Sequence, residues 1–248
     1  MAVRVLRSFG ILSPRLWRLA ALILTVGMLI AIPLEILVGV TQRRSDFALG
    51  SDFAVYVEAA RRWMSGNGFY LARQLQGPYP LQVGDVLYPP TTLWVFVPFT
   101  VLPAALWWTV ALGVLGYVVW TWRPAIWTWP VMAAGLAYGM TPLMYLRGSP
   151  VIMVAALVAA GLRWGWPGAL VLLKPSVLPF ALAGIRSRGY WLTVALLGLL
   201  TLPLMSMIPD WIRVMVDGQG GGLLYSINDV PLLTVPVVAW LGRSPREV

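Results

Sequence analysis

The 248-residue chain contains no cysteine and no histidine. Without cysteine there is no disulfide framework, no thiolate nucleophile and no cysteine-ligated metal or cluster. Without histidine, a Ser-His-Asp hydrolase, a histidine-ligated zinc site and a histidine general base are excluded. Any chemistry must therefore depend on carboxylates, arginines, tyrosines, the single lysine and backbone groups.

Charge is also scarce. Soluble domains carry roughly 25% charged residues. Here 11% are charged, 59% are hydrophobic, and the mean hydropathy is +0.79. We therefore expect an all-α, polytopic transmembrane helical bundle that forms one domain over residues 1–248. The net charge of +9 comes from basic residues that flank apolar segments. Membrane orientation explains this charge without nucleic acid, so the expected partner is the lipid bilayer.

The pattern predicts about six to seven membrane segments, separated by outer loops at about 41–90 and 209–229. The segments cover about 17–40, 91–121, 125–146, 150–162, 166–184, 190–208 and 230–241. The block 91–121 is too long for one straight span, and we expect a short membrane-entering piece followed by a full helix. The basic N-terminus followed by an apolar run is typical of a retained signal anchor.

Charge counting predicts a multi-pass protein of the cell (plasma) membrane with a cytoplasmic N-terminus. The cytoplasmic side would hold one acid, Glu247, and these arginines: Arg4, Arg7, Arg15, Arg18, Arg123, Arg163, Arg186, Arg188, Arg243 and Arg246. The outer side would hold seven basic residues and also seven acids, which are Asp46, Asp52, Glu58, Asp85, Asp210, Asp217 and Asp229. Arg163 and Arg186 share a side only if 166–184 turns back within the membrane, with Lys174-Pro175 as the break. The alternative is a plain span that leaves Arg186 outside.

The first outer loop has the pattern of an amphipathic helix that begins at Asp52, with Ser51 as its N-cap. Its apolar face would hold Phe53, Val57, Ala60 and Met64. Its ion pairs would join Glu58 to Arg61 and Arg62. Gly66-Asn67-Gly68 would end the helix. We expect the helix on the outer membrane surface. The helix dipole would favour an ionised Asp52, which is either functional or a solvated end-of-helix acid.

Three further features can contribute to a site. Tyr88-Pro89-Pro90 predicts a rigid point of re-entry into the membrane. Lys174 lies inside an apolar run, so it either belongs to a functional site or extends to a near interface. Lys174, Arg147 and Arg213 can each neutralise a phosphate, although the two arginines can also simply mark an interface. The glycines at 220–222 are weak evidence for phosphate binding and suggest a flexible cover.

The order of these motifs resembles the GT-C membrane glycosyltransferases, closest in type to the bacterial polyprenol-phosphate-mannose-dependent alpha-mannosyltransferases. The resemblance covers about residues 45–235. In its first part, Ser51-Asp52-Phe53 is followed one turn on by Tyr56 and then by Gly66-x-Gly68-Phe69-Tyr70. Tyr88-Pro89-Pro90 comes next, with Pro98 and Leu102-Pro103 after it, and Leu173-Lys174-Pro175 precedes Arg186-x-Arg188. Each motif is short, and their order and spacing carry the resemblance.

The resemblance implies transfer of a sugar, here expected to be mannose, from a polyprenyl-phosphate donor to a lipid or glycan acceptor at the extracytoplasmic face. Asp52 would be the general base. Tyr56, Tyr88, Arg147, Lys174 and Asn228 are the expected substrate-binding residues. We expect no metal and no cofactor. A lipid phosphate is a good leaving group, and a single displacement assisted by one base inverts the anomeric centre.

Two departures keep other functions open. Where members of the family usually have Gly-Gln-x-Asn, this chain has Gly148-Ser149-Pro150, and it ends soon after the second loop, whereas they continue with several more spans. One alternative is a non-catalytic, truncated family member or scaffold. Another is a transporter or flippase of a lipid-linked anion with Lys174 at its midplane. Repeated halves would favour a transporter, and the sequence contains no internal repeat.

Overall fold

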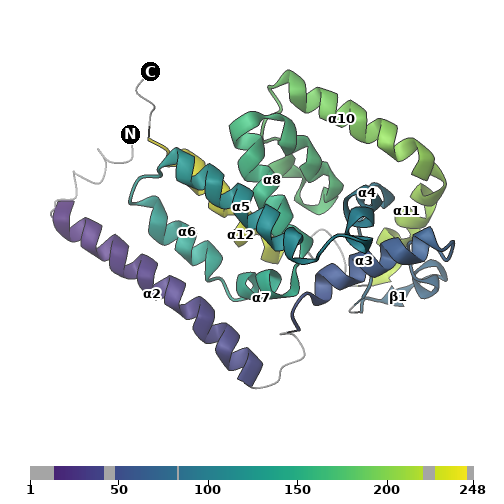
Figure 1. The fold of residues 1–248 in the computed structure, drawn as a ribbon, viewed down its shortest axis with the longest axis horizontal. Helices are drawn as coiled ribbons and strands as arrows, with labels where there is room; N and C mark the ends of the chain where they lie inside the picture. The colour runs from purple at the N-terminus through teal and green to yellow at the C-terminus, as the bar shows by residue number, and fades with distance from the viewer. Residues whose placement is uncertain (1–13, 42–47, 83, 220–226, 245–248) are drawn as a thin grey trace.

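The structure, a computed structural model, describes residues 14–41, 48–82, 84–219 and 227–244. Within these ranges the chain is mostly helical, as the composition predicts (Figure 1). The strands in these ranges form one short parallel pair, β1 (Tyr79–Pro80) and β2 (Gly218–Gln219). Most of the basic N-terminal region and the glycines at 220–222 lie outside the described residues.

Three helical runs are long and apolar enough to cross a membrane. They are α2 (Pro14–Thr41), α5 (Ala105–Trp122), and a continuous run over 188–217 made of α10 (Arg188–Thr201), η7 (Leu202–Met207) and α11 (Ile208–Asp217). The count reaches four if α7 (Met140–Arg147) and α8 (Pro150–Trp164), which meet at a bend of 100°, form one span. The other expected segments are present as shorter elements.

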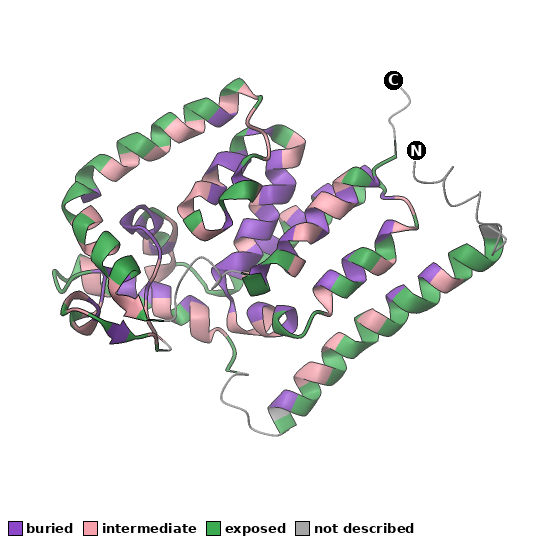
Figure 2. Cartoon of the chain, turned by 180° about the vertical axis from the view of Figure 1, so that it is seen from behind, coloured by how far each residue is buried: buried purple, intermediate pink, exposed green. Residues whose placement is uncertain are grey.

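The core of the bundle lies around α8, which packs against α5 and α12 (Val230–Leu241). Small side chains such as Ala155 and Ala159 are fully buried along α8 and allow this close packing. Figure 2 shows the contrast with α2 and α10, whose surfaces are largely exposed. Exposed faces built from leucine and isoleucine match lipid hydrocarbon, because lipid tails are as apolar as these side chains.

The prediction of a single span over 125–146 is wrong. The segment forms α6 (Thr128–Leu136) and α7, separated at Ala137–Gly139. At 1.5 Å per residue α6 extends only about 14 Å, less than half of the roughly 30 Å hydrocarbon core. The break turns the chain toward Gly148-Ser149, where α8 begins with Pro150 at a position that needs no N–H donor.

Residues 166–184 turn back, as the charge pattern predicts. η5 (Trp166–Leu173) leads away from Gly165, and η6 (Pro175–Val177) and α9 (Leu178–Ala181) lead back to Gly184. The two arms touch through glycines: a Cβ on Gly168 would overlap the carbonyl oxygen of Ala183. Gly165 and Gly184 lie side by side, so Arg163 and Arg186 are at the same end of the bundle.

Most described acids lie toward one end of the bundle, whereas arginines lie at both ends. The C-terminal ends of α5 and α12 meet, because Ala125 N donates to Gly242 O at 2.8 Å and Ser244 N donates to Trp122 O at 3.2 Å. The N-terminal part of α2 borders the same region, since Ala21 and Thr25 line a groove with Pro124. This end therefore holds Arg15, Arg18, Arg123, Arg163, Arg186, Arg188 and Arg243. The opposite end, which includes α3 (Ser51–Met64), β1 and α11 (Figure 1), holds Asp52, Glu58, Asp85, Asp210 and Asp217, together with Arg61, Arg62, Arg73, Arg147 and Arg213.

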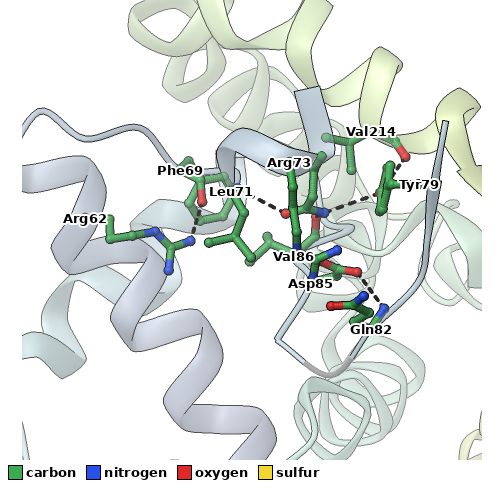
Figure 3. Close-up of polar contacts among 10 residues, drawn as sticks. Arg62, Phe69, Leu71, Arg73, Tyr79, Gln82, Asp85, Val86 and Val214 are labelled. Atoms are coloured by element: carbon green, nitrogen blue, oxygen red, sulfur yellow. Dashed lines mark hydrogen bonds and ion pairs between the residues drawn. The ribbon is translucent and has the colours of Figure 1, made fainter. Parts of the chain in front are cut away.

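A layer of short elements that contacts α11 lies at that opposite end, and Figure 3 shows its polar contacts. Within it, Arg73 of η2 (Ala72–Leu75) pairs with Asp85, and buried Gln74 donates to the Val86 carbonyl at 3.2 Å. The Tyr79 hydroxyl donates to Val214 O of α11 at 2.9 Å. Residues 209–217 of the expected outer loop at 209–229 are helical and contact this layer. The bond from Gln74 holds Val86, two residues before Tyr88.

Candidate functional site

The helix α3 (Ser51–Met64) starts against the end of α7. Gly50, with a left-handed φ of 71°, is its N-cap, and the Gly50 N–H donates to the Leu146 carbonyl at 2.9 Å. The prediction that Ser51 caps the helix is wrong, because no side chain caps it. The Ser51 Oγ instead accepts a hydrogen bond from Arg147 Nε at 3.3 Å.

The amphipathic pattern of α3 is confirmed, although the helix packs on protein through its apolar face. Phe53, Val57 and Ala60 are buried as predicted, whereas Met64 is exposed. The Phe53 ring lies 5.4 Å from that of Phe99 and 5.5 Å from that of Trp107. Aromatic pairs of this kind contribute about 0.5–1.5 kcal/mol each beyond buried area. These contacts hold α3 on the residues that precede and begin α5.

The polar face of α3 is partly as predicted. Glu58 and Arg61 form an ion pair at 3.6 Å, but both side chains are 57% exposed, so the pair contributes little stability. Arg62 does not pair with Glu58 and donates to the Phe69 carbonyl at 2.9 Å (Figure 3). The helix ends at Met64, just before the predicted stop at Gly66.

Asp52 pairs with Arg147, the last residue of α7, with 2.7 Å between Oδ1 and Nη2. Gly148 ends α7 in a left-handed conformation with φ of 66°, and a Cβ there would lie 2.6 Å from Trp108 and 2.9 Å from Phe53. The indole N–H of Trp107 donates to the Gly148 carbonyl at 3.0 Å. Backbone contacts around Gly148 therefore fix Arg147 beside Asp52.

The environment of Asp52 differs from that of a solvated helix-end acid. Its side chain is 25% exposed and that of Arg147 is 24% exposed. Burial raises the pKa of the Asp52 carboxyl above its usual value, and the Arg147 guanidinium opposes this rise. Asp52 is thus a half-buried, paired carboxylate with a raised proton affinity.

Lys174 lies at the turn of the hairpin, between η5 and η6, with φ of −122° and ψ of 83°, outside the helical region that Pro175 disfavours for the residue before it. Its Nζ lies 3.1 Å from Asp229 Oδ2 and donates to the Tyr88 hydroxyl at 2.8 Å. The contact with Oδ2 is an ion pair without hydrogen-bond geometry. The Lys174 and Asp229 side chains are 5% and 8% exposed, so the alternative that Lys174 extends to an interface is wrong. Lys174 is a buried, paired charge.

Two tyrosines connect Lys174 with the start of α3. Tyr56, one turn after Asp52, meets the Tyr88 ring edge-on at 5.1 Å and stacks on Phe96 at 4.9 Å. Lys174 Nζ lies 4.9 Å from the centre of the Tyr88 ring. The charge of Lys174 also lowers the pKa of the Asp52 carboxyl, although its effect is smaller than those of burial and of Arg147.

The predicted site residues are therefore largely brought together. Asp52, Tyr56, Tyr88, Arg147 and Lys174 gather where α3, α7 and the hairpin meet. Asn228 is exposed, and its Oδ1 accepts a weak hydrogen bond from Tyr138 at 3.5 Å. Arg213 is exposed on α11.

The sequence reasoning missed two members of the site, Ser51 as a partner of Arg147 and Asp229 as a partner of Lys174. A signal for Asp229 existed. A buried charge in a membrane protein usually pairs with an opposite one, and Asp229 directly precedes the last apolar segment. Pairing every acid at a segment boundary with the lone lysine would have made Asp229 a candidate.

An open groove of about 1080 Å³ runs between α3 and the start of α5. Its lining is mostly apolar and includes Phe53, Phe99, Leu102 and Trp108, with Glu58 and Arg61 also present. Asp52 and Arg147 do not line this groove, but Phe53, which does, lies beside Gly148, the residue that follows Arg147. The arrangement thus combines a carboxylate, two cations and an apolar channel.

The described residues include no cluster of three acids that can hold a metal ion. The arrangement can accept a proton at Asp52 and can neutralise an anion at Arg147 or Lys174. Neither capacity identifies a substrate by itself. No protein-family model, curated protein or solved structure matches this chain.

Proposed function

We propose that this protein is a membrane glycosyltransferase. It moves a sugar from a polyprenyl-phosphate-linked donor to a lipid or glycan acceptor at the extracytoplasmic face. The resemblance to the bacterial mannosyltransferases implies that this sugar is mannose. One observation carries the proposal: a half-buried carboxylate, Asp52, pairs with Arg147 and lies within electrostatic reach of Lys174. These residues come from three separate parts of the chain.

Asp52 is the general base. The acceptor hydroxyl loses its proton as its oxygen attacks the anomeric carbon, and a positioned carboxylate with a raised pKa accepts that proton well. Arg147 stabilises the negative charge that grows on the departing phosphate, because its planar guanidinium matches phosphate oxygens. Transfer in one displacement inverts the anomeric centre, whereas a retaining site uses two carboxylates about 5 Å apart around the sugar.

The groove beside α3 supports a lipid-linked donor. A polyprenyl chain needs an apolar channel, and Phe53, Phe99 and Leu102 line an open apolar groove. Phe53 also lies beside Gly148, which follows Arg147, so a chain in the groove can place its phosphate end near Arg147. The largely exposed apolar surfaces of α2 and α10 support a site embedded in a bilayer.

The gathering of the described acids around the site, away from the end that carries arginines without acids, supports an extracytoplasmic location for the site. Basic residues are retained on the cytoplasmic side of membrane proteins. The end of the bundle that carries Arg123, Arg163 and Arg243 is then cytoplasmic, and Asp52 is at the outer end. A polyprenyl-phosphate sugar is a suitable donor there, because it requires no nucleotide.

The test compares Asp52→Asn with Asp217→Asn in purified protein that is given a radiolabelled polyprenyl-phosphate sugar and membrane lipid acceptors. Loss of a general base reduces the rate about 10²–10⁴-fold. Asp217 is the matched control, because it is an acid at the same end of the bundle that does not line the groove. We expect Asp52→Asn to lose transfer and Asp217→Asn to keep it. Full activity of Asp52→Asn would refute the assignment of the base.

A transporter or flippase of a lipid-linked anion is the second candidate. The observation in its favour is the Lys174–Asp229 pair, buried at the turn of a hairpin that enters and leaves at one end of the bundle. A flippase would move a fluorescent lipid phosphate across a proteoliposome membrane, with dependence on Lys174 and none on Asp52. A scaffold would show neither transfer nor movement.

A further inference from the structure

We propose that the donor phosphate itself releases the base: on binding, it takes Arg147 away from Asp52, so that the carboxylate is free only when a donor is in place. This inference rests on the proposed function and deepens it, because it sets the order in which the two substrates act. Donor binding comes first, and proton abstraction from the acceptor follows.

The charged side chains at the site form two ion pairs. Asp52 pairs with Arg147, and Asp229 pairs with Lys174. Two cations and two carboxylates cancel, and each cation already has an acid as its partner. A phosphate that binds either cation must therefore replace a carboxylate. Binding is an exchange of anions at one of the two pairs.

Exposure identifies which pair exchanges. The Lys174 and Asp229 side chains are 5% and 8% exposed, and Lys174 also donates to the Tyr88 hydroxyl. Separating that pair would leave a buried, uncompensated charge, which is strongly unfavourable. The Asp52 and Arg147 side chains are 25% and 24% exposed, so the solvent can reach both. The partly exposed pair of Asp52 and Arg147 therefore exchanges partners, and the buried pair of Lys174 and Asp229 stays intact.

Arg147 has the donors that such an exchange requires. Its Nε donates to Ser51 Oγ at 3.3 Å, while Nη2 contacts Asp52 at 2.7 Å. A guanidinium carries five N–H donors in a planar fork, and it binds phosphate through two of them. The hydrogen bond to Ser51 can keep Arg147 at the site while its outer nitrogens change partner. No large movement of α7 is needed.

The displaced acid is the proposed base, which links donor binding to catalysis. Once Arg147 contacts phosphate, Asp52 loses the cation that lowers its proton affinity. The acceptor hydroxyl then gives its proton to Asp52, its oxygen bonds to the anomeric carbon, and the bond from that carbon to the phosphate oxygen breaks. The electron pair leaves on the phosphate, beside Arg147. Without a donor, Asp52 remains paired with Arg147, which holds its proton affinity below the value it reaches once that cation is gone.

The test measures the state of Asp52 directly rather than activity. A hydrophobic carbodiimide modifies protonated carboxyls, and mass spectrometry quantifies the adduct on each acid of the full chain in nanodiscs. Farnesyl phosphate is the probe, farnesol lacks the phosphate, and inorganic phosphate lacks the lipid. Removing a paired cation raises a carboxyl pKa by about one to three units, so labelling of Asp52 at pH 7 should rise about tenfold or more.

We expect saturating farnesyl phosphate to increase labelling of Asp52 and to leave Asp229 unchanged. Farnesol should have no effect, and inorganic phosphate should act only at much higher concentration. In Arg147→Gln, Asp52 should label at the raised rate with or without ligand. The comparison within the wild-type protein stands even if this variant folds poorly.

Tryptophan fluorescence, measured in parallel, reports binding. Saturable binding of farnesyl phosphate with unchanged or reduced labelling of Asp52 would overturn the exchange and leave the proposed function intact. If farnesyl phosphate does not bind at all, both the exchange and the proposed use of a polyprenyl-phosphate donor are overturned. If inorganic phosphate is as effective as the lipid, the site recognises free phosphate, and the ordered mechanism is overturned.

Discussion

Lys174 and Asp229 form an ion pair across 3.1 Å, between the turn of the 166–184 hairpin and the residue that precedes α12. Both side chains are almost fully buried. The pair therefore holds the hairpin against α12 and supports the ring of Tyr88 beneath the lysine. Its energetic role differs from that of a surface pair, because neither charge can be solvated if its partner is lost.

A double-mutant cycle tests this role. Lys174→Met and Asp229→Asn each leave one buried charge without a partner, and each should lower the free energy of unfolding by about 3–5 kcal/mol. The double variant should recover much of that loss, because it leaves no uncompensated charge. Unfolding of the purified protein in detergent, followed by tryptophan fluorescence, gives the four values.

The control cycle uses Glu58→Gln and Arg61→Met, whose ion pair is exposed on both sides. Exposed pairs contribute about 0–1 kcal/mol, so this cycle should show little coupling. Equal coupling energies in the two cycles would contradict a special role for the buried pair.

The pH dependence of transfer should follow the protonation of Asp52. A general base must be ionised, so activity is present above its pKa and is lost as the pH falls through it. Because burial raises the pKa of Asp52 above 3.8, the acidic limb should lie above that pH. Arg147 lowers this pKa, so Arg147→Gln should move the limb of kcat/KM to higher pH. The measurement is kcat/KM against pH for both proteins.

The same profiles test the order of events. The limb of kcat/KM reports the free enzyme, in which Asp52 is paired, and the limb of kcat reports the donor-bound enzyme. With Arg147 bound to phosphate, the kcat limb of the wild-type protein should lie at the higher pH. A shift of the Arg147→Gln limb toward lower pH would have the wrong sign for loss of a cation and would contradict the assignment.

Much of the fold is readable from local chemistry. Proline and glycine positions predict the break at Lys174-Pro175, the rigid entry at Tyr88-Pro89 and the end of α3 near Gly66. The return of the hairpin follows from requiring Arg163 and Arg186 to share one side. These features depend on backbone sterics and on charge placement, which a sequence displays directly.

The predictions that the structure contradicts failed for a different reason. The sequence pattern of Ser51-Asp52 predicts a capped helix start, but the nearby guanidinium of Arg147 binds the Ser51 hydroxyl instead. The span expected over 125–146 breaks because α7 must turn to meet α3 through Gly50 and Leu146. Both outcomes depend on contacts between segments far apart in the chain, which periodicity does not encode.

Gly148 should be the backbone position on which the site depends most. Gly148→Ala would adopt a left-handed φ of 66° and place its Cβ 2.6 Å from Trp108. Strain and overlap together should cost about 1–3 kcal/mol and move Arg147 away from Asp52. We expect lower stability and a lower kcat/KM, measured by detergent unfolding and by transfer assays.

Gly113→Ala is the matched control, because that glycine lies within α5 and a Cβ added to it would meet no other atom within 4 Å. Alanine in a helix interior is favoured over glycine by roughly 0.5–1 kcal/mol. Equal effects of the two substitutions would show that the contacts of Gly148 are unimportant.

The hairpin makes a prediction about topology that a straight span contradicts. The chain contains no cysteine, so single-cysteine variants can report which side of a membrane each position faces. Trp164→Cys and Ser187→Cys lie before and after the hairpin, next to each other at the end that carries Arg163. Ser65→Cys lies at the opposite end, just after α3.

A membrane-impermeant maleimide applied to intact cells should label the cysteine at 65 and neither of the other two. After permeabilisation, the cysteines at 164 and 187 should both become labelled, because the hairpin returns to its starting side. If intact cells label the cysteine at 187 but not the cysteine at 164, residues 166–184 cross the membrane. In that case Lys174 would lie within a span rather than at the turn of a hairpin, which would contradict the contact between Gly165 and Gly184.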